Sequence, residues 1–176
     1  MMDMSEEVFF TSLALGRTFT REEWWAWLKE NPNHGTSDPV IEVHGFGFNI
    51  CNVCLNPNKI EFGKHSWFVE IKTAINLDGK WIAAHDYSVN HSGGGSGVSL
   101  RQKESFDTEK EAIFNELCIV EKRVKREMEN IRKYHGGYEP DDGEKVESTD
   151  ALIAKCKKLL SQISEYKDIY DSQTLF

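Results

Sequence analysis

The clearest pattern of hydrophobic and polar positions runs over residues 66–90, where two β-rich segments flank Asp78-Gly79. A two-residue type I′ turn at Asp78-Gly79 makes Ile75 face Ile82 across an antiparallel hairpin. One face of this hairpin is then largely apolar and is predicted to be core. It comprises Trp67, Val69, Ile71, Thr73, Ile75, Ile82 and Ala84.

The opposite face of the predicted hairpin mixes aromatic with charged side chains. It comprises Phe68, Glu70, Lys72, Ala74, Asn76, Trp81, Ala83, His85, Tyr87 and Val89. Such a face either binds a partner or is covered by a helix or loop of the same chain. The pattern favours covering, and Trp81, His85 and Tyr87 are the candidate binding residues if the face is open.

Two helices are predicted before the sheet. Residues 5–16 can form a short helix, although the run VFFTSLAL is also compatible with a strand. Thr20 and Glu23 have the spacing of a capping box, which opens a second helix that a proline turn ends. Trp25 points away from the apolar face of that helix. The apolar face, which is predicted to be core, comprises Trp24, Trp27 and Leu28.

Two long amphipathic helices are predicted after the sheet. Asp107 or Thr108 caps the first, whose apolar positions recur every three to four residues. Ser148 or Thr149 caps the second. The acidic, glycine-bearing loop 136–149 between them is short, so the two helices are predicted to form an antiparallel hairpin.

These elements predict an α+β fold, in which an antiparallel sheet of three to four strands packs with helices and a helical hairpin ends the chain. The alternating segment 39–53 is predicted to add a strand that bends at its two glycines. We expect a single domain. Residues 1–135 form its α+β core with the first long helix, and residues 136–176 add the acidic loop and the last helix.

Composition and charge place the chain among globular proteins and restrict its partners. Hydrophobic residues make up 39% and charged residues 28% of the chain. The net charge of −8 and the pI near 5.3 argue against broad, unspecific attraction to nucleic acid or anionic membranes. No apolar stretch reaches the ~18 residues that span a bilayer, and no secretory signal is visible, so we expect a cytoplasmic protein without membrane association.

Cysteine and histidine residues give weak chemical candidates. Cys51 and Cys54 have the C-x₂-C spacing of half a zinc site, but a second closely spaced pair of ligands is missing. His85 and Asp86 lie on opposite faces of a strand, which argues against an acid–base dyad. The sequence therefore predicts no cofactor and no metal, and it favours a binding protein over an enzyme.

Two further segments are candidates for contacting a partner. The glycine loop after the hairpin lacks G-K-[ST] and a following helix, so it is predicted to be a connector that can contribute to a binding site. Its candidate residues are His91, Gly93, Gly94 and Gly95. The long helix carries a basic run that alternates with glutamates, which is typical of an ion-paired surface and alternatively forms a phosphate-binding strip. Its candidate residues are Lys122, Arg123, Lys125 and Arg126.

Residues 77–113 combine LDGKW, an aromatic-containing strand, a triple-glycine loop, a short strand and the helix start SFDTEKEAI. In this order the segment resembles uncharacterised small proteins and protein segments of phages, plasmids and other mobile elements, in which G-x-W, a glycine-rich loop and F-x-[ST]-x-x-EAI recur. The likeness covers about a fifth of the chain and brings no catalytic residue with it. It implies a small protein that binds nucleic acid or a host or defence factor.

Three functional classes follow from these patterns. The first is a non-enzymatic protein that contacts a protein partner through the hairpin aromatics and the glycine loop. The second is a nucleic-acid-binding protein that stacks bases on those aromatics and contacts phosphates with the basic helix. The third is an acidic mimic of nucleic acid, which the negative net charge permits.

Overall fold

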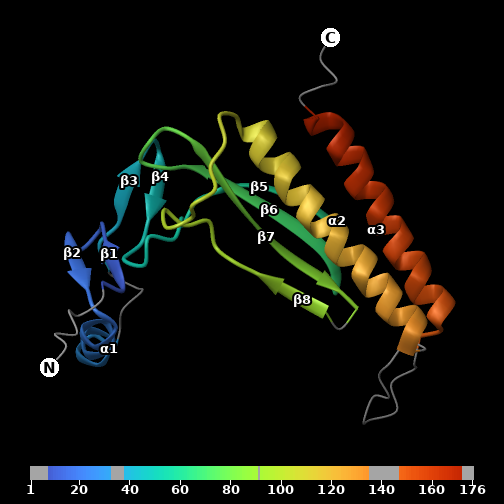
Figure 1. Cartoon of the computed structure of the whole chain (residues 1–176), viewed down its shortest axis with the longest axis horizontal. Helices are drawn as coiled ribbons and strands as arrows, with labels where there is room; N and C mark the ends of the chain where they lie inside the picture. The colour runs from blue at the N-terminus through green and yellow to red at the C-terminus, as the bar shows by residue number, and fades with distance from the viewer. Residues whose placement is uncertain (1–7, 33–37, 91, 135–146, 172–176) are drawn as a thin grey trace, which may run out of the picture.

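A computed structural model of the chain describes residues 8–32, 38–90, 92–134 and 147–171. The predicted α+β fold is confirmed, and Figure 1 shows its elements arranged as an arch, with α1 at one end and the α2–α3 pair at the other. In chain order the elements are β1 (Phe10–Ser12), β2 (Arg17–Phe19), α1 (Arg21–Glu30), β3 (Ile41–Val43), β4 (Phe46–Phe48), β5 (Asn58–Lys64), β6 (Trp67–Ile75), β7 (Trp81–Val89), β8 (Ser92–Gly95), α2 (Glu109–Tyr134) and α3 (Thr149–Tyr170).

The helix predicted over residues 5–16 is wrong in the part that the structure describes, because β1 and β2 form a hairpin there. Phe10 and Ser12 are buried while Thr11 between them is exposed, which is the two-residue period of a strand. The Phe10 ring stacks on Phe19 of β2 with 5.6 Å between ring centroids. Burial of two phenylalanines on one side of the hairpin therefore decides between the two interpretations that the sequence allows.

The helix α1 begins and packs as its sequence predicts. Thr20 and Glu23 form the capping box, in which each side chain bonds the backbone N–H of the other residue. Trp24 is buried against β1 and β2, and the Trp27 ring stacks on it at 5.3 Å. Trp25 points away and is 59% exposed. Because α1 covers the small hairpin, it does not cover the central sheet (Figure 1).

Within the alternating segment 39–53, β3 and β4 form a separate two-stranded sheet rather than a strand of the central sheet. His44 and Gly45 both have positive φ, 49° and 85°, as a tight two-residue hairpin turn requires. The hairpin packs on one end of the central sheet, where it builds a second hydrophobic cluster. The buried members of that cluster are Val43, Phe46, Phe48, Cys54, Ala74, Ile82, Ala84 and Val98.

The central sheet has four antiparallel strands in the order β5-β6-β7-β8, and α2 and α3 cover one of its faces (Figure 1). The two helices lie side by side and form the predicted C-terminal helical pair. Their apolar sides and the covered sheet face build the largest hydrophobic cluster. Its members without measurable exposure are Val69, Val89, Leu117, Val120, Val124, Cys156 and Ile163.

The predicted register of the β6–β7 hairpin is wrong by one residue. Ile75 pairs with Trp81 rather than facing Ile82, because the connecting loop has five residues, 76–80. The Asn76 side-chain oxygen accepts hydrogen bonds from the backbone N–H groups of Asp78 and Lys80, at 3.0 and 2.9 Å, and thereby widens the turn. A shift of one residue moves every β7 side chain to the other face of the sheet.

The face of β7 that carries Trp81, His85 and Tyr87 is therefore the helix-covered face, and the prediction that these residues lie on the mixed polar face is wrong. They share this face with Val69 and Ile71 of β6. The expectation that elements of the chain itself cover the hairpin aromatics is correct. The covering element at His85 and Tyr87 is α2.

The sheet face that α2 and α3 do not cover carries an ion-pair network across β5, β6 and β7, in the part that lies away from the β3–β4 hairpin. Glu70 accepts a hydrogen bond from Lys59 at 3.1 Å and pairs with Lys72 at 3.1 Å, and Lys72 also pairs with Asp86. Burial favours the neutral form of Glu70, but the hydrogen bonds from the two lysines outweigh it and lower the pKa of Glu70. Likewise, burial works against charged Lys72, but its bonds to Asp86 and Glu70 raise the pKa of Lys72.

Acid is expected to weaken this network. Because the pKa of Glu70 is lower in the folded than in the unfolded chain, its contribution to stability is present above pH ~4.5 and is lost as the pH falls through the folded value. Glu70→Gln should cost about 1 kcal/mol at pH 7 and flatten the loss of stability below pH 5, measured by urea unfolding across pH. Glu61→Gln, an exposed neighbour on β5, is the control. Parallel pH profiles for wild type and Glu70→Gln would contradict this role.

Candidate binding site at the β7–β8 edge

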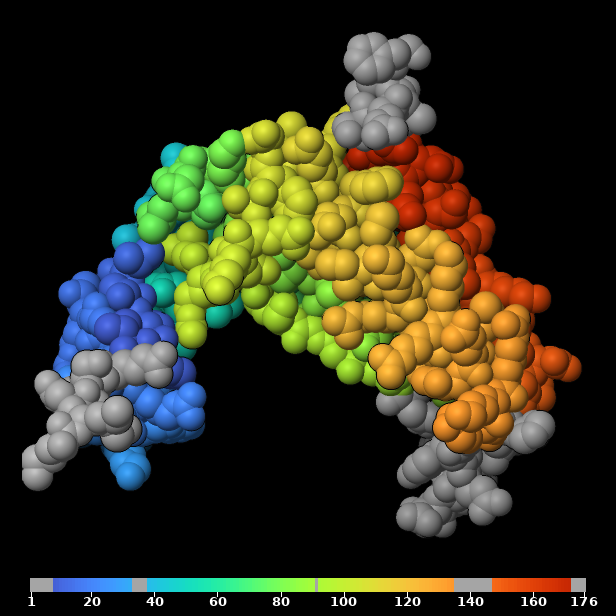
Figure 2. Space-filling view, in the orientation of Figure 1, coloured from blue at the N-terminus to red at the C-terminus, as the bar shows by residue number. Residues whose placement is uncertain are grey.

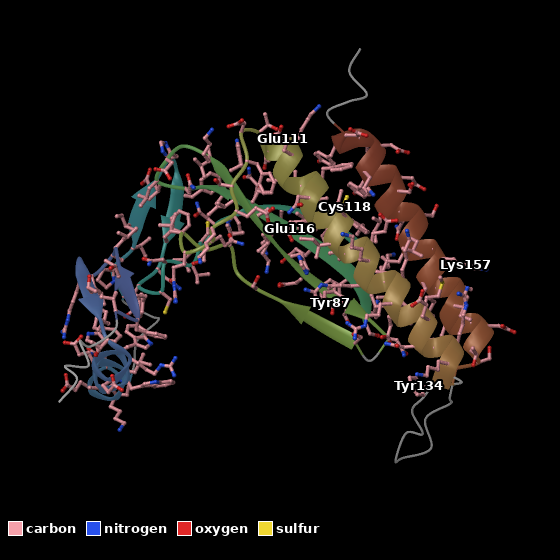
Figure 3. The ribbon with its side chains drawn as sticks, viewed as in Figure 1. Tyr87, Glu111, Glu116, Cys118, Tyr134 and Lys157 are labelled. Carbon is pink, nitrogen blue, oxygen red and sulfur yellow. The ribbon has the colours of Figure 1, made fainter. Side chains whose placement is uncertain are left out.

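The structure brings several predicted candidates together where β7 and β8 meet α2. His85 and Tyr87 point from β7 toward the helix, Arg123 reaches back from α2, and Gly94 of β8 pairs with Tyr87. Figure 3 shows Tyr87 between β8 and α2, with Glu116 farther toward the start of the helix. We call the row Glu116, His85, Tyr87 and Arg123, with β8 beside it, the edge site.

The buried end of the edge site is a hydrogen-bonding contact between a histidine and a glutamate side chain. His85 Nδ1 lies against the Glu116 carboxylate, and the two side chains are 12% and 9% exposed. Glu116 was missed as a site residue from the sequence. The sequence feature that could have identified Glu116 is its place in the apolar stripe of α2, three residues after Ile113 and four before Val120, where a carboxylate is unusual.

The exposed end of the edge site is an aromatic ring paired with a cation. The Arg123 guanidinium donates to the Tyr87 hydroxyl at 3.4 Å and lies 5.2 Å from the ring centroid. The His85 ring lies 5.9 Å from the Tyr87 ring on the other side of the contact. Tyr87 is thereby held between a buried pair and an exposed arginine, so its ring position is fixed by both neighbours.

The glycine segment predicted to be a connector is instead the edge strand β8, which pairs with β7. Gly95 lies so close to β7 that an added Cβ would be 2.8 Å from the Asp86 Cα, and no real side chain fits there. At Gly94 an added Cβ would meet the Tyr87 ring at an ordinary 3.6 Å. Close strand pairing, rather than a phosphate cradle, explains the glycine at position 95. His91 lies outside the described residues.

The outer edge of β8 exposes backbone groups. Ser96 N–H donates to His85 C=O at 3.2 Å, which places Ser96 opposite His85 in a hydrogen-bonded pair. In an antiparallel ladder the next residue points its N–H and C=O the other way, so those of Gly93 and Gly95 point away from β7. Within the described part of the chain, no residue hydrogen-bonds them. Figures 1 and 2 show β8 along the hollow, concave side of the arch.

The remaining predicted residues do not converge on the edge site. Trp81 is at the far end of β7, where its backbone bonds Phe106 and its ring lies 6.2 Å from Phe46. Lys125 pairs with Glu121. Lys122 and Arg126 are exposed, with no carboxylate within 4.0 Å among the described residues. Arg123 is the member of the predicted basic strip that contacts a hairpin aromatic.

The two cysteines of the C-x₂-C pair pack into different hydrophobic clusters. Cys54 is buried beside Phe46 and Phe48, whereas Cys51 packs against the cluster around Phe10. Burial raises the pKa of both thiols, which disfavours the thiolate that a metal ion binds. Among the described residues, no group of three or more histidine, cysteine or acidic side chains is placed to hold a metal ion.

Comparison with protein-family models, with curated proteins and with solved structures finds no match. In the part of the chain that the structure describes, no helix has the length and apolar character to cross a membrane. The chain is therefore an α+β protein in which the outer edge of β8 lies beside the contact between Tyr87 and Arg123.

Proposed function

We propose that the protein is a non-enzymatic binding protein that takes an extended segment of a partner protein as an added strand on β8. The observation that carries this proposal is the outward backbone of Gly93 and Gly95, which offers donors and acceptors without side chains in the way. Strand addition supplies affinity through main-chain hydrogen bonds and specificity through side-chain contacts at alternate positions. Tyr87 and Arg123 provide such a contact next to the edge.

Arg123 and the chain's charge favour a protein partner over nucleic acid. The Arg123 guanidinium already lies over the Tyr87 ring, which leaves less of the ring for a base to stack on. Glu121 pairs with Lys125, which reduces the contacts that Lys125 can make with a phosphate. The resemblance of residues 77–113 to mobile-element proteins supports a host or defence factor as the partner. A carboxylate in the bound segment would suit Arg123.

Proline at position 93 tests the proposal. Gly93→Pro removes an outward N–H that β7 does not use, so capture of a partner from the native cell should fall at least tenfold. Gly94→Ala is the matched control, because its Cβ meets Tyr87 at ordinary contact distance and its N–H faces β7. The measurement is quantitative affinity capture, with thermal unfolding of each variant to verify the fold.

Hydrogen exchange identifies the strand pairing directly. Once a captured partner is purified, the amides of Gly93 and Gly95 should gain protection in the complex, because they become hydrogen-bonded. Equal capture by wild type and Gly93→Pro, without new protection at these amides, would refute strand addition. Binding of single-stranded DNA or RNA at low salt, lost on Arg123→Gln and Arg126→Gln, would favour the nucleic-acid class instead.

A further inference from the structure

A cavity lies away from the edge site, between the β5–β6 turn and α3. Its volume is about 520 Å³, which is within the range of small-molecule sites. Lys64, His65 and Trp67 line it from the sheet side, and Lys155 and Lys158 line it from the helix. None of these residues belongs to the edge site.

The titratable side chains that line this cavity are lysines and a histidine, although the chain carries a net charge of −8. Lys64 and Lys158 have no carboxylate within 4.0 Å among the described residues. Lys155 pairs with Glu147, and its ammonium lies 5.4 Å from the centroid of the Trp67 ring. Positive charge is therefore concentrated in a cavity that also has an aromatic wall.

We propose that this cavity binds a small phosphate monoester that carries a flat ring, such as a nucleoside monophosphate. Three lysines line the cavity, and their ammonium groups can supply charge-assisted hydrogen bonds to a phosphate. The Leu159 side chain, together with the Trp67 ring once the phosphate draws the Lys155 ammonium off its face, supplies an apolar surface on which a ring packs. The Glu147 carboxylate competes with the phosphate for Lys155 and limits the affinity.

The test is a titration of the ¹⁵N-labelled full chain followed by NMR, with three probes at constant ionic strength. Adenosine monophosphate should shift the amides of residues 63–67 and 155–162 saturably. Inorganic phosphate, which lacks the ring, and adenosine, which lacks the charge, should each bind at least fivefold more weakly. Failure of the monophosphate to saturate by 10 mM, or binding no tighter than that of inorganic phosphate, would overturn the proposal.

Charge variants locate the site. Lys64→Gln and Lys158→Gln should each weaken monophosphate binding about 3- to 10-fold, whereas Lys157→Gln, exposed on α3 and outside the cavity, should leave it unchanged (Figure 3). Glu147→Gln should tighten binding, because it frees Lys155, whereas Asp168→Asn near the end of α3 should not. Equal effects of Lys157→Gln and Lys158→Gln would show only general charge attraction and overturn the site.

Discussion

Replacing His85 with alanine is expected to lower the free energy of unfolding by about 3 kcal/mol, because it leaves the buried Glu116 carboxylate without its partner. The two side chains meet between β7 and α2, where water has little access, so the lost contact is not replaced by hydration. Urea unfolding at pH 7, monitored by circular dichroism, measures the loss. A cost below 1 kcal/mol would contradict a structural role for the pair.

The double variant His85→Leu, Glu116→Leu separates the contact from the space it fills. Replacing both partners of a buried pair with apolar side chains is often neutral in stability, so this variant should unfold within about 1.5 kcal/mol of wild type. If it is as unstable as His85→Ala, the loss arises from packing rather than from the unpaired carboxylate.

Local signals made α1, α2 and α3 predictable from the sequence. Thr20 with Glu23, and Thr108 with Glu111, form reciprocal side-chain to backbone hydrogen bonds at the starts of α1 and α2. Each cap involves residues three apart, so no knowledge of the tertiary fold is needed to recognise it. The stripe of apolar residues along α2 was equally local, and it is buried as predicted.

The strand pairing was predictable only in outline, because register depends on one loop. Asp78-Gly79 indicated a turn correctly, but the hydrogen bonds of the Asn76 side chain made the loop longer than two residues. That difference placed Tyr87 under α2 rather than on the opposite face. A mixture of apolar and polar residues on both faces of β7 left the sequence without a way to correct the error.

The edge site was only partly visible in the sequence for a related reason. Tyr87 and Gly94 were candidates because of their residue types, and the sheet places them opposite each other. Arg123 was one of four basic residues in its run, and only helix packing selects it as the neighbour of Tyr87. Glu116 lies 31 residues from His85, so no local pattern joins them.

Core truncations at opposite ends of the arch test the single-domain prediction. Leu117 is fully buried between α2 and the central sheet, and Phe19 is fully buried between the β1–β2 hairpin and α1. Leu117→Ala should cost about 3–5 kcal/mol, and Phe19→Ala a similar amount, because each leaves a cavity. If the chain is one domain, both variants shift one common unfolding transition, seen alike by tryptophan fluorescence and by far-ultraviolet circular dichroism.

The physical reason to expect one transition is Asn52, which links the N-terminal hairpin to the rest of the chain. Its buried side chain accepts a hydrogen bond from Leu13 N–H at 3.0 Å and donates to Thr11 C=O at 2.6 Å, while its own C=O binds Leu100 N–H. Asn52→Ala should therefore split the transition, with the tryptophan signal of α1 lost first.

Because Asn52 has a φ of 61°, Asn52→Gly is the control that relieves the backbone while still removing the bonds. Splitting in both variants would assign the coupling to the side-chain hydrogen bonds, whereas a split already present in Phe19→Ala would show that the two ends fold separately.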